Sequence, residues 1–108
     1  MAELDDGGTT ASVARLSDDR RTPVVSIAGE IDISNADQVK SALLAEVGDE
    51  PQDIIVDVSA LTFMDSSGIA ILVQVSKSVA PVELRNPTPI VRRVITATGL
   101  SEHFGMAE

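Results

Sequence analysis

The stretch that decides the fold of this chain is residues 61–73, which read LTFMDSSGIAILV. An apolar run at residues 54–58 precedes it and predicts a strand, and the apolar spacing after Gly68 predicts a helix. Residues 65–67 stand where a helix leaves its first backbone N–H groups without partners. A serine there lies where the helix dipole favours negative charge, so it can accept a phosphate without breaking the fold.

Length and composition indicate one small α/β domain with an acidic surface. Of the 108 residues, 44% are hydrophobic and two are aromatic, so the core is aliphatic. The net charge of −9 argues against nucleic acid and anionic membrane as ligands and favours a basic protein surface. The lack of cysteine excludes disulfides and thiolate catalysis and fits a cytoplasmic protein. We expect neither a signal peptide nor a membrane-spanning segment.

Outside the central stretch, the chain alternates short strands with helices. Its acidic, glycine-rich start predicts disorder over residues 1–10, and we expect the folded domain to occupy residues 11–108. The expected strands are 12–16, 24–28, 53–58 and 82–84, with a short strand or frayed tail at 101–108. The expected helices are 34–47, 66–79 and 88–98. This order predicts a mixed, mostly parallel sheet with an N-terminal hairpin, packed against about three helices.

Residue types at the element boundaries predict helix caps and buried faces. Ser34 is expected to cap the first helix with Asp37 as the acid of a capping box, and Thr88 to cap the third. The continuous apolar residues 54–56 predict a strand covered on both faces. The inner face of the third helix is expected to carry Ile90, Val91, Val94 and Ile95.

Three short motifs, in the same order as these elements, resemble those of the STAS domain family. Residues 65–68 (DSSG), preceded by residues 57–61 (DVSAL), resemble the family signature. Residues 29–32 (GEID) resemble a second family element, and residues 98–100 (TGL) resemble a third. Together the motifs cover almost the whole chain, from about Ala11 to Phe104. The resemblance implies the family fold.

Within that family, a free-standing chain of this size resembles the bacterial anti-sigma factor antagonists. The resemblance implies a regulatory protein, not an enzyme, that binds an anti-sigma factor and thereby frees the sigma factor. It also implies that the anti-sigma factor is a serine kinase that phosphorylates Ser66, that phosphorylation abolishes binding, and that a serine phosphatase restores it. No cofactor, metal or direct nucleic-acid contact is expected for this chain, and a cytoplasmic monomer is implied.

The same resemblance implies where the partner binds. It places Asp32 in contact with the kinase or with the phosphoacceptor, and it assigns Asp65 to the surroundings of that serine. Gly68 is expected to allow close packing at the helix start, and Asp57 to hold the adjoining loop through backbone hydrogen bonds. The residues expected to contact the partner are Glu30, Ile31, Asp32, Asp65, Ser66, Ser67 and Gly68.

Several alternatives stay open on the sequence alone. Ser66 could be only a helix cap, a role that Ser67 or Asp65 fills equally well, and Asp32 could be a simple turn residue. The domain could instead be a scaffold or subunit of a stress-signalling or lipid-transport complex that is not switched at Ser66. A small serine hydrolase is a distant alternative, although no G-x-S-x-G motif or orienting carboxylate supports His103 as its base.

Overall fold

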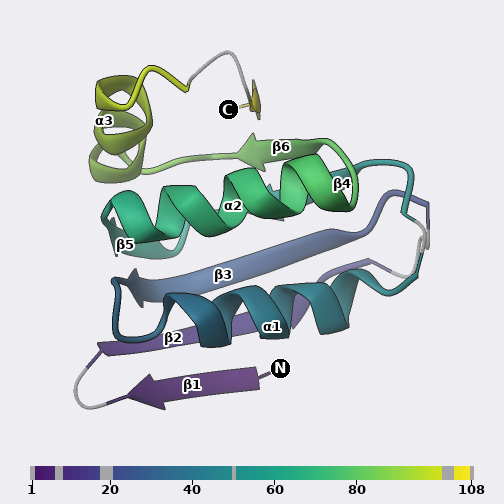
Figure 1. Ribbon diagram of the computed structural model, residues 1–108, viewed down its shortest axis with the longest axis horizontal. Helices are drawn as coiled ribbons and strands as arrows, with labels where there is room; N and C mark the ends of the chain where they lie inside the picture. The colour runs from purple at the N-terminus through teal and green to yellow at the C-terminus, as the bar shows by residue number, and fades with distance from the viewer. Residues whose placement is uncertain (1, 7–8, 18–20, 50, 101–103, 108) are drawn as a thin grey trace.

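A mixed sheet with two helices on one face carries the fold (Figure 1). It is seen in a computed structural model that describes the chain except residues 1, 7–8, 18–20, 50, 101–103 and 108. The strands are β1 (Ala2–Asp6), β2 (Thr9–Arg15), β3 (Val24–Ile31), β4 (Ile54–Asp57), β5 (Leu61–Met64), β6 (Val82–Arg85) and β7 (Gly105–Ala107). The helices are α1 (Ala36–Val47), α2 (Ser66–Ser78) and α3 (Pro89–Ala97).

The strand order is β1-β2-β3-β4-β6-β7, with β5 paired to β3 outside this path. The pairs β1·β2 and β2·β3 are antiparallel, and the pairs formed by β3, β4, β5, β6 and β7 are parallel. The mixed, mostly parallel sheet and its N-terminal hairpin are therefore confirmed. The last strand was expected as a strand or a frayed tail, and β7 extends the parallel part of the sheet.

Strand β5 was not predicted, because its four residues read as a loop. The first half of β3 pairs with β4, and its second half, after a register shift between Gly29 and Glu30, pairs with β5. A strand this short, with an irregular burial pattern, has no alternating signal of its own. It forms because the far end of β3 extends beyond β4 and offers unpaired backbone groups.

The start of the chain also differs from the expectation. Disorder was predicted for residues 1–10, but β1 pairs with β2 along its whole length, and β2 begins at Thr9. This pairing uses backbone N–H and C=O groups, which composition does not report. The predicted domain start at residue 11 thus falls inside β2.

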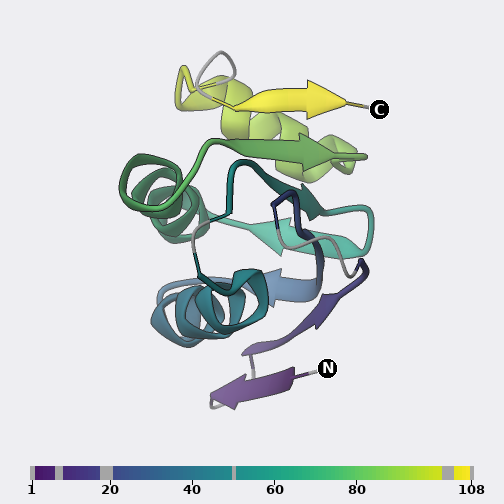
Figure 2. The same ribbon diagram turned by 90° about the vertical axis from the view of Figure 1, so that its right-hand side faces the viewer.

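The core lies between the sheet and the layer formed by α1 and α2 (Figure 2). Ile54 and Val56 of β4 are buried, whereas Ile55 between them is half-buried. The prediction of a strand covered on both faces was therefore wrong, because among the described residues α1 and α2 cover a single face of the sheet. A continuous apolar run does not distinguish the two cases by itself.

Helix α3 packs against β5 at one end of the sheet. Its N-cap is Thr88, as the sequence predicted, and the Thr88 hydroxyl accepts a hydrogen bond from the backbone N–H of Val91. The same hydroxyl donates a hydrogen bond to the carbonyl of Leu61, a partner that only the fold brings close. Val91 and Ile95 are buried and Val94 is partly buried, but Ile90 is 45% exposed. The assignment of Ile90 to the inner face was wrong.

Candidate functional site

Ser66 is the first residue of α2 and its side chain is exposed. The N-cap is the preceding residue, Asp65, whose Oδ1 accepts hydrogen bonds from the backbone N–H of Ser67 at 2.9 Å and from the Ser67 hydroxyl. The Asp65 side chain thus provides a hydrogen-bond partner for one of the free backbone N–H groups at the start of α2, that of Ser67. Ser66 is not the cap, and its hydroxyl stands at the positive end of the α2 dipole, where a phosphate is tolerated.

Gly68 is buried where α2 crosses β5 and β3. A Cβ added at this position would lie 2.3 Å from Cγ and 2.8 Å from Sδ of Met64, and 3.3 Å from Cγ2 of Ile31. Only a glycine lets the first turn of α2 approach those two buried side chains this closely. The expected packing role of Gly68 is confirmed, and this packing sets how closely the first turn of α2, which includes Ser66, approaches β3 and β5.

The loop between β3 and α1 is folded on itself by polar side chains. Asp32 Oδ1 accepts hydrogen bonds from the backbone N–H and the hydroxyl of Ser34, at 2.8 and 2.5 Å. The buried side chain of Asn35 accepts from the backbone N–H of Asp32 at 3.0 Å and donates to the carbonyl of Glu30 at 2.9 Å. These four bonds hold residues 30–35 in one conformation.

This loop corrects the predicted start of α1. The helix begins at Ala36, and Asn35 occupies the N-cap position without a side-chain cap bond. Ser34 was expected there, but it bonds to Asp32 instead, and Asp37 lies in the first turn without completing a capping box with it. The role of Asn35 was not predicted, because its side-chain amide forms hydrogen bonds with the preceding loop rather than with the backbone of the helix.

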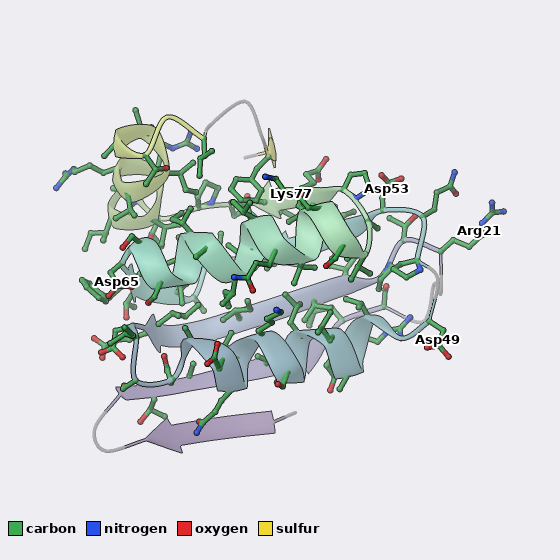
Figure 3. All side chains as sticks on the ribbon, viewed as in Figure 1. Arg21, Asp49, Asp53, Asp65 and Lys77 are labelled. Atoms are coloured by element: carbon green, nitrogen blue, oxygen red, sulfur yellow. The ribbon has the colours of Figure 1, made fainter. Side chains whose placement is uncertain are left out.

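The loop between β3 and α1 and the β5–α2 junction meet at the carboxyl end of the parallel strands. The backbone N–H of Asp65 donates to the carbonyl of Ile31 at 3.3 Å, and Ile31 pairs in register with Met64. Figure 3 shows Asp65 at this end of the molecule, with Asp49 and Asp53 at the other. Motifs more than 30 residues apart in sequence, 29–32 and 65–68, are thereby brought side by side.

Two residues of the predicted contact set are buried. Ile31 is fully buried, and Gly68, in the first turn of α2, is buried against Met64 and Ile31, so neither exposes a side chain to a partner. Glu30 and Ser66 are exposed, and Asp32, Asp65 and Ser67 are half-buried. The sequence could not separate the outward side chains of these loops from the inward ones.

A shallow groove of about 440 Å³ begins at Ser66 and follows α2. Its apolar lining comes from Ile69, Ala70 and Val73 on α2 and from Leu100 after α3, with Gln74 and Thr98 completing it. None of the described residues that line the groove carries a charge. Ser66 therefore stands at the end of an uncharged, mostly apolar surface.

Two exposed apolar residues near the site were missed. Ile33, at the tip of the loop that Asn35 holds, is 86% exposed, and Phe63 of β5 is 42% exposed. The available signal was an isoleucine between Asp32 and Ser34, in a turn where polar residues are usual. Asp57 behaves as predicted, because its Oδ1 accepts a hydrogen bond from the backbone N–H of Ser59 at 2.9 Å.

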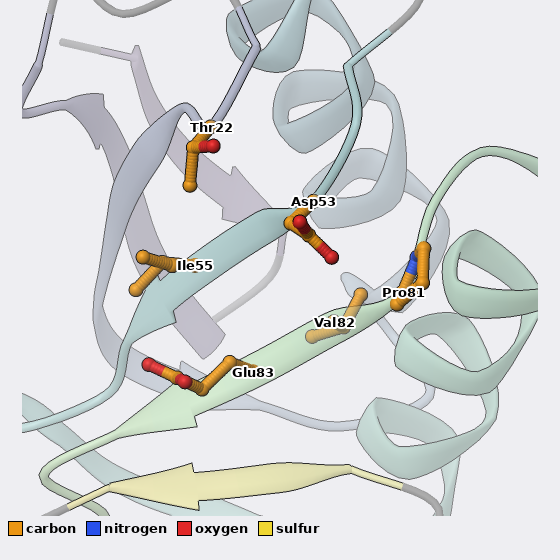
Figure 4. Close-up of a pocket in the computed structure, with 6 residues that line it drawn as sticks. All are labelled: Thr22, Asp53, Ile55, Pro81, Val82 and Glu83. Carbon is orange, nitrogen blue, oxygen red and sulfur yellow. The ribbon is translucent and has the colours of Figure 1, made fainter.

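A second cavity lies at the amino ends of β4 and β6, far from Ser66 (Figure 4). It measures about 330 Å³ and is lined by Thr22, Asp53, Ile55, Pro81, Val82 and Glu83. Within the described ranges, no three or more His, Cys, Asp or Glu residues are grouped to hold a metal ion. No described helix is both long enough and apolar enough to cross a membrane. His103, the base considered for a hydrolase, lies outside the described residues.

Comparisons with known proteins agree with this geometry. The family model described as the STAS domain matches residues 14–108. The anti-sigma-F factor antagonist RsfB of Mycobacterium tuberculosis is 32% identical over 94 residues, which cover 82% of this chain and 75% of RsfB. The crystal structure of an anti-sigma factor antagonist from Mycobacterium paratuberculosis has a TM-score of 0.72 at 33% identity, covering 89% of this chain and 86% of that chain.

The anti-sigma factor antagonist SpoIIAA is similar in both of its solved forms. Its unphosphorylated form has a TM-score of 0.68 at 25% identity, covering 90% of this chain and 89% of that chain. The phosphorylated form, described as a Bacillus cell fate determinant, has a TM-score of 0.58 at 24% identity, covering 90% and 92%.

Proposed function

This chain belongs to the STAS domain family, and from that membership we propose that it is an anti-sigma factor antagonist. The observation that carries the proposal is an exposed Ser66 at the start of α2, beside a preorganised acidic loop. Two relatives named as anti-sigma factor antagonists, at 32% and 33% identity, support it.

In the proposed mechanism, the protein binds an anti-sigma factor and thereby releases the sigma factor. The anti-sigma factor is also a serine kinase, which phosphorylates Ser66 and so ends its own binding, and a serine phosphatase restores the active form. The kinase supplies ATP, magnesium and the catalytic base, so this chain is a substrate without a cofactor rather than a catalyst. It acts as a monomer in the cytoplasm.

The proposed switch acts at the surface. Phosphorylation adds about −1.5 to −2 charges and three acceptor oxygens at the start of α2. Because Ser66 is exposed and is not the cap, the added group displaces nothing inside the fold. It stands instead at the end of the uncharged groove, where a partner must remove water from it. A cost of about 3 kcal/mol would weaken binding by a factor on the order of 100.

The test is capture of partners from lysate of the source cell, with wild type, Ser66→Ala, Ser66→Asp and Ser41→Asp as baits. Ser41 is exposed on α1, so Ser41→Asp adds the same charge elsewhere on a helix. We expect an ATP-binding anti-sigma factor on wild type, Ser66→Ala and Ser41→Asp, and its loss from Ser66→Asp. The captured kinase, once purified, should add one phosphate to wild type and none to Ser66→Ala, as read by mass spectrometry.

Two results would contradict the proposed switch at Ser66, and a third would contradict the function itself. Equal capture of the anti-sigma factor by all four baits would leave Ser66 as a helix residue only. A phosphate on Ser67 would move the switch by one residue. Capture of a transport ATPase subunit in place of an anti-sigma factor would support the alternative of a lipid-transport subunit.

A further inference from the structure

We propose that Ile33 and Phe63, flanked by Glu30 and Asp32, form the anchor by which this chain holds its protein partner. We infer that the partner offers an apolar pocket bordered by Arg or Lys side chains. The inference rests on the proposed function and names the chemistry of the surface that the partner must present. Ile33 and Phe63, together with the flanking residues Glu30 and Asp32, are called the Ile33–Phe63 anchor below.

Ile33 is exposed at the tip of a loop that hydrogen bonds hold in place. It stands between Asp32 and Ser34, whose mutual hydrogen bonds close the loop, and Asn35 ties the same loop to the carbonyl of Glu30 and the N–H of Asp32. With 86% of its surface exposed, its side chain contributes little to the core. A loop that is already ordered loses little entropy on binding, which is the property of a preorganised anchor.

Phe63 is a second exposed apolar side chain at this end of the sheet, on β5. It pairs in register with Glu30 across β3 and β5, and both side chains are exposed, whereas the next pair, Ile31 and Met64, is buried. Because side chains alternate faces along a strand, Phe63 and Glu30 point away from α2. Aromatic side chains, phenylalanine among them, are enriched in protein interfaces.

The charge around the anchor indicates the partner's chemistry. The charged residues within 29–35 and 61–68 are Glu30, Asp32 and Asp65, all acidic. A basic rim around the partner's pocket would be attracted to them and would steer association. A second copy of this chain is disfavoured, because a symmetric contact would set these carboxylates against each other.

The anchor and Ser66 act on different parts of the partner. Phe63 and Glu30 lie on the face away from α2, while the groove that starts at Ser66 follows α2 itself. A phosphate on Ser66 would border this groove, where a partner that covers the groove must desolvate the added charge. This desolvation cost opposes binding even when the partner carries basic groups.

The test measures dissociation constants by isothermal titration calorimetry with the anti-sigma factor that wild type captures, in purified form. Ile33→Ser and Phe63→Ser are compared with Leu16→Ser. Leu16 is 57% exposed, and its backbone N–H bonds to Val24 at the opposite end of the sheet. We expect Ile33→Ser and Phe63→Ser each to weaken binding about tenfold or more, and Leu16→Ser less than about twofold.

A second pair of variants tests the charge. Glu30→Gln and Asp49→Asn each remove one negative charge, and Asp49 lies at the opposite end of the molecule (Figure 3). We expect Glu30→Gln to slow association about two- to fivefold at low salt and to reduce its salt dependence, and Asp49→Asn to change neither.

The outcomes separate this inference from the proposed function. If Ser66→Asp loses the anti-sigma factor but Ile33→Ser binds as wild type does, the anchor is wrong and the function stands. If wild type captures no anti-sigma factor, both the anchor proposal and the proposed function are wrong. If wild type forms a dimer in analytical ultracentrifugation that Ile33→Ser dissociates, the surface serves a second copy and the anchor proposal is overturned.

Discussion

At the scale of single residues, the site depends on small groups that permit close approach. Gly68 lets α2 lie on Met64 and Ile31, and Gly29, at a φ of +100°, lets β3 shift its register where a Cβ would lie 2.4 Å from the carbonyl oxygen of Thr10. The first glycine sets the height of Ser66, and the second allows β3 to leave β4 and pair with β5. Both glycines thus help to position the loops of the candidate site.

Gly68→Ala should destabilise the protein by about 1–3 kcal/mol, because the new methyl group overpacks a fully occupied contact with Met64. The free energy of unfolding can be measured in urea by far-ultraviolet circular dichroism, since the chain has no Trp or Tyr. Ser41→Ala, at an exposed position of α1, is the control and should change stability by less than about 0.5 kcal/mol. Equal stability of Gly68→Ala and wild type would show that Met64 can move aside.

At the scale of elements, the loop between β3 and α1 behaves as a small ordered unit. Its order comes from Asn35, which joins the end of β3 to the start of α1 through two backbone partners. Further along the chain, Asp65 and Thr88 play a comparable part at the starts of α2 and α3. Each of these side chains fixes where a helix leaves the sheet, and together they set the geometry of the site end.

Asn35→Ala should loosen this loop, because the N–H of Asp32 and the carbonyl of Glu30 both lose a partner. We expect a loss of about 1–3 kcal/mol in stability and faster amide hydrogen exchange over residues 30–36. Ser34→Ala is the matched control, since it removes a single exposed hydrogen bond to Asp32 and should cost less than about 1 kcal/mol. If exchange at Asp32 is as slow in Asn35→Ala as in wild type, the amide of Asn35 does not hold the loop.

At the scale of the whole molecule, the two ends of the sheet differ in character. At the carboxyl end lie the loop between β3 and α1, Ser66 and the uncharged groove. At the amino end lies the cavity lined by Asp53 and Glu83. Helix α3 and β5 pack together at the carboxyl end, and α1 is linked to α2 by a hydrogen bond from Lys40 to Gln74 at 2.7 Å. These contacts join the helices to one another and to the end of the sheet that carries Ser66.

Ser66→Asp should accordingly leave the fold unchanged. We expect a far-ultraviolet circular dichroism spectrum that overlays the wild-type spectrum and a Tm within about 3 °C of wild type, because a carboxylate at the start of a helix is favoured. Ser78→Asp places the same charge at the opposite end of α2, where the dipole opposes it, and should lower the Tm more. A large loss of structure in Ser66→Asp would mean that the switch acts by unfolding rather than at the surface.

What the sequence determined by itself is the set of features that neighbouring residues encode. Periodic apolar residues predicted the three helices, Thr88 followed by Pro89 marked the start of α3, and residues 65–68 marked the start of α2. These features were predictable because caps and helix periodicity depend on contacts within a few residues.

Only the tertiary structure decided which residues of the two motifs face outward. Strand β5 exists because β3 extends beyond β4, and Ile31 is buried because Gly68 brings α2 down onto it. Ile33 is exposed because Asn35 folds its loop back onto Glu30. Burial and strand pairing join residues that lie far apart in the sequence, and a local pattern carries no record of those partners.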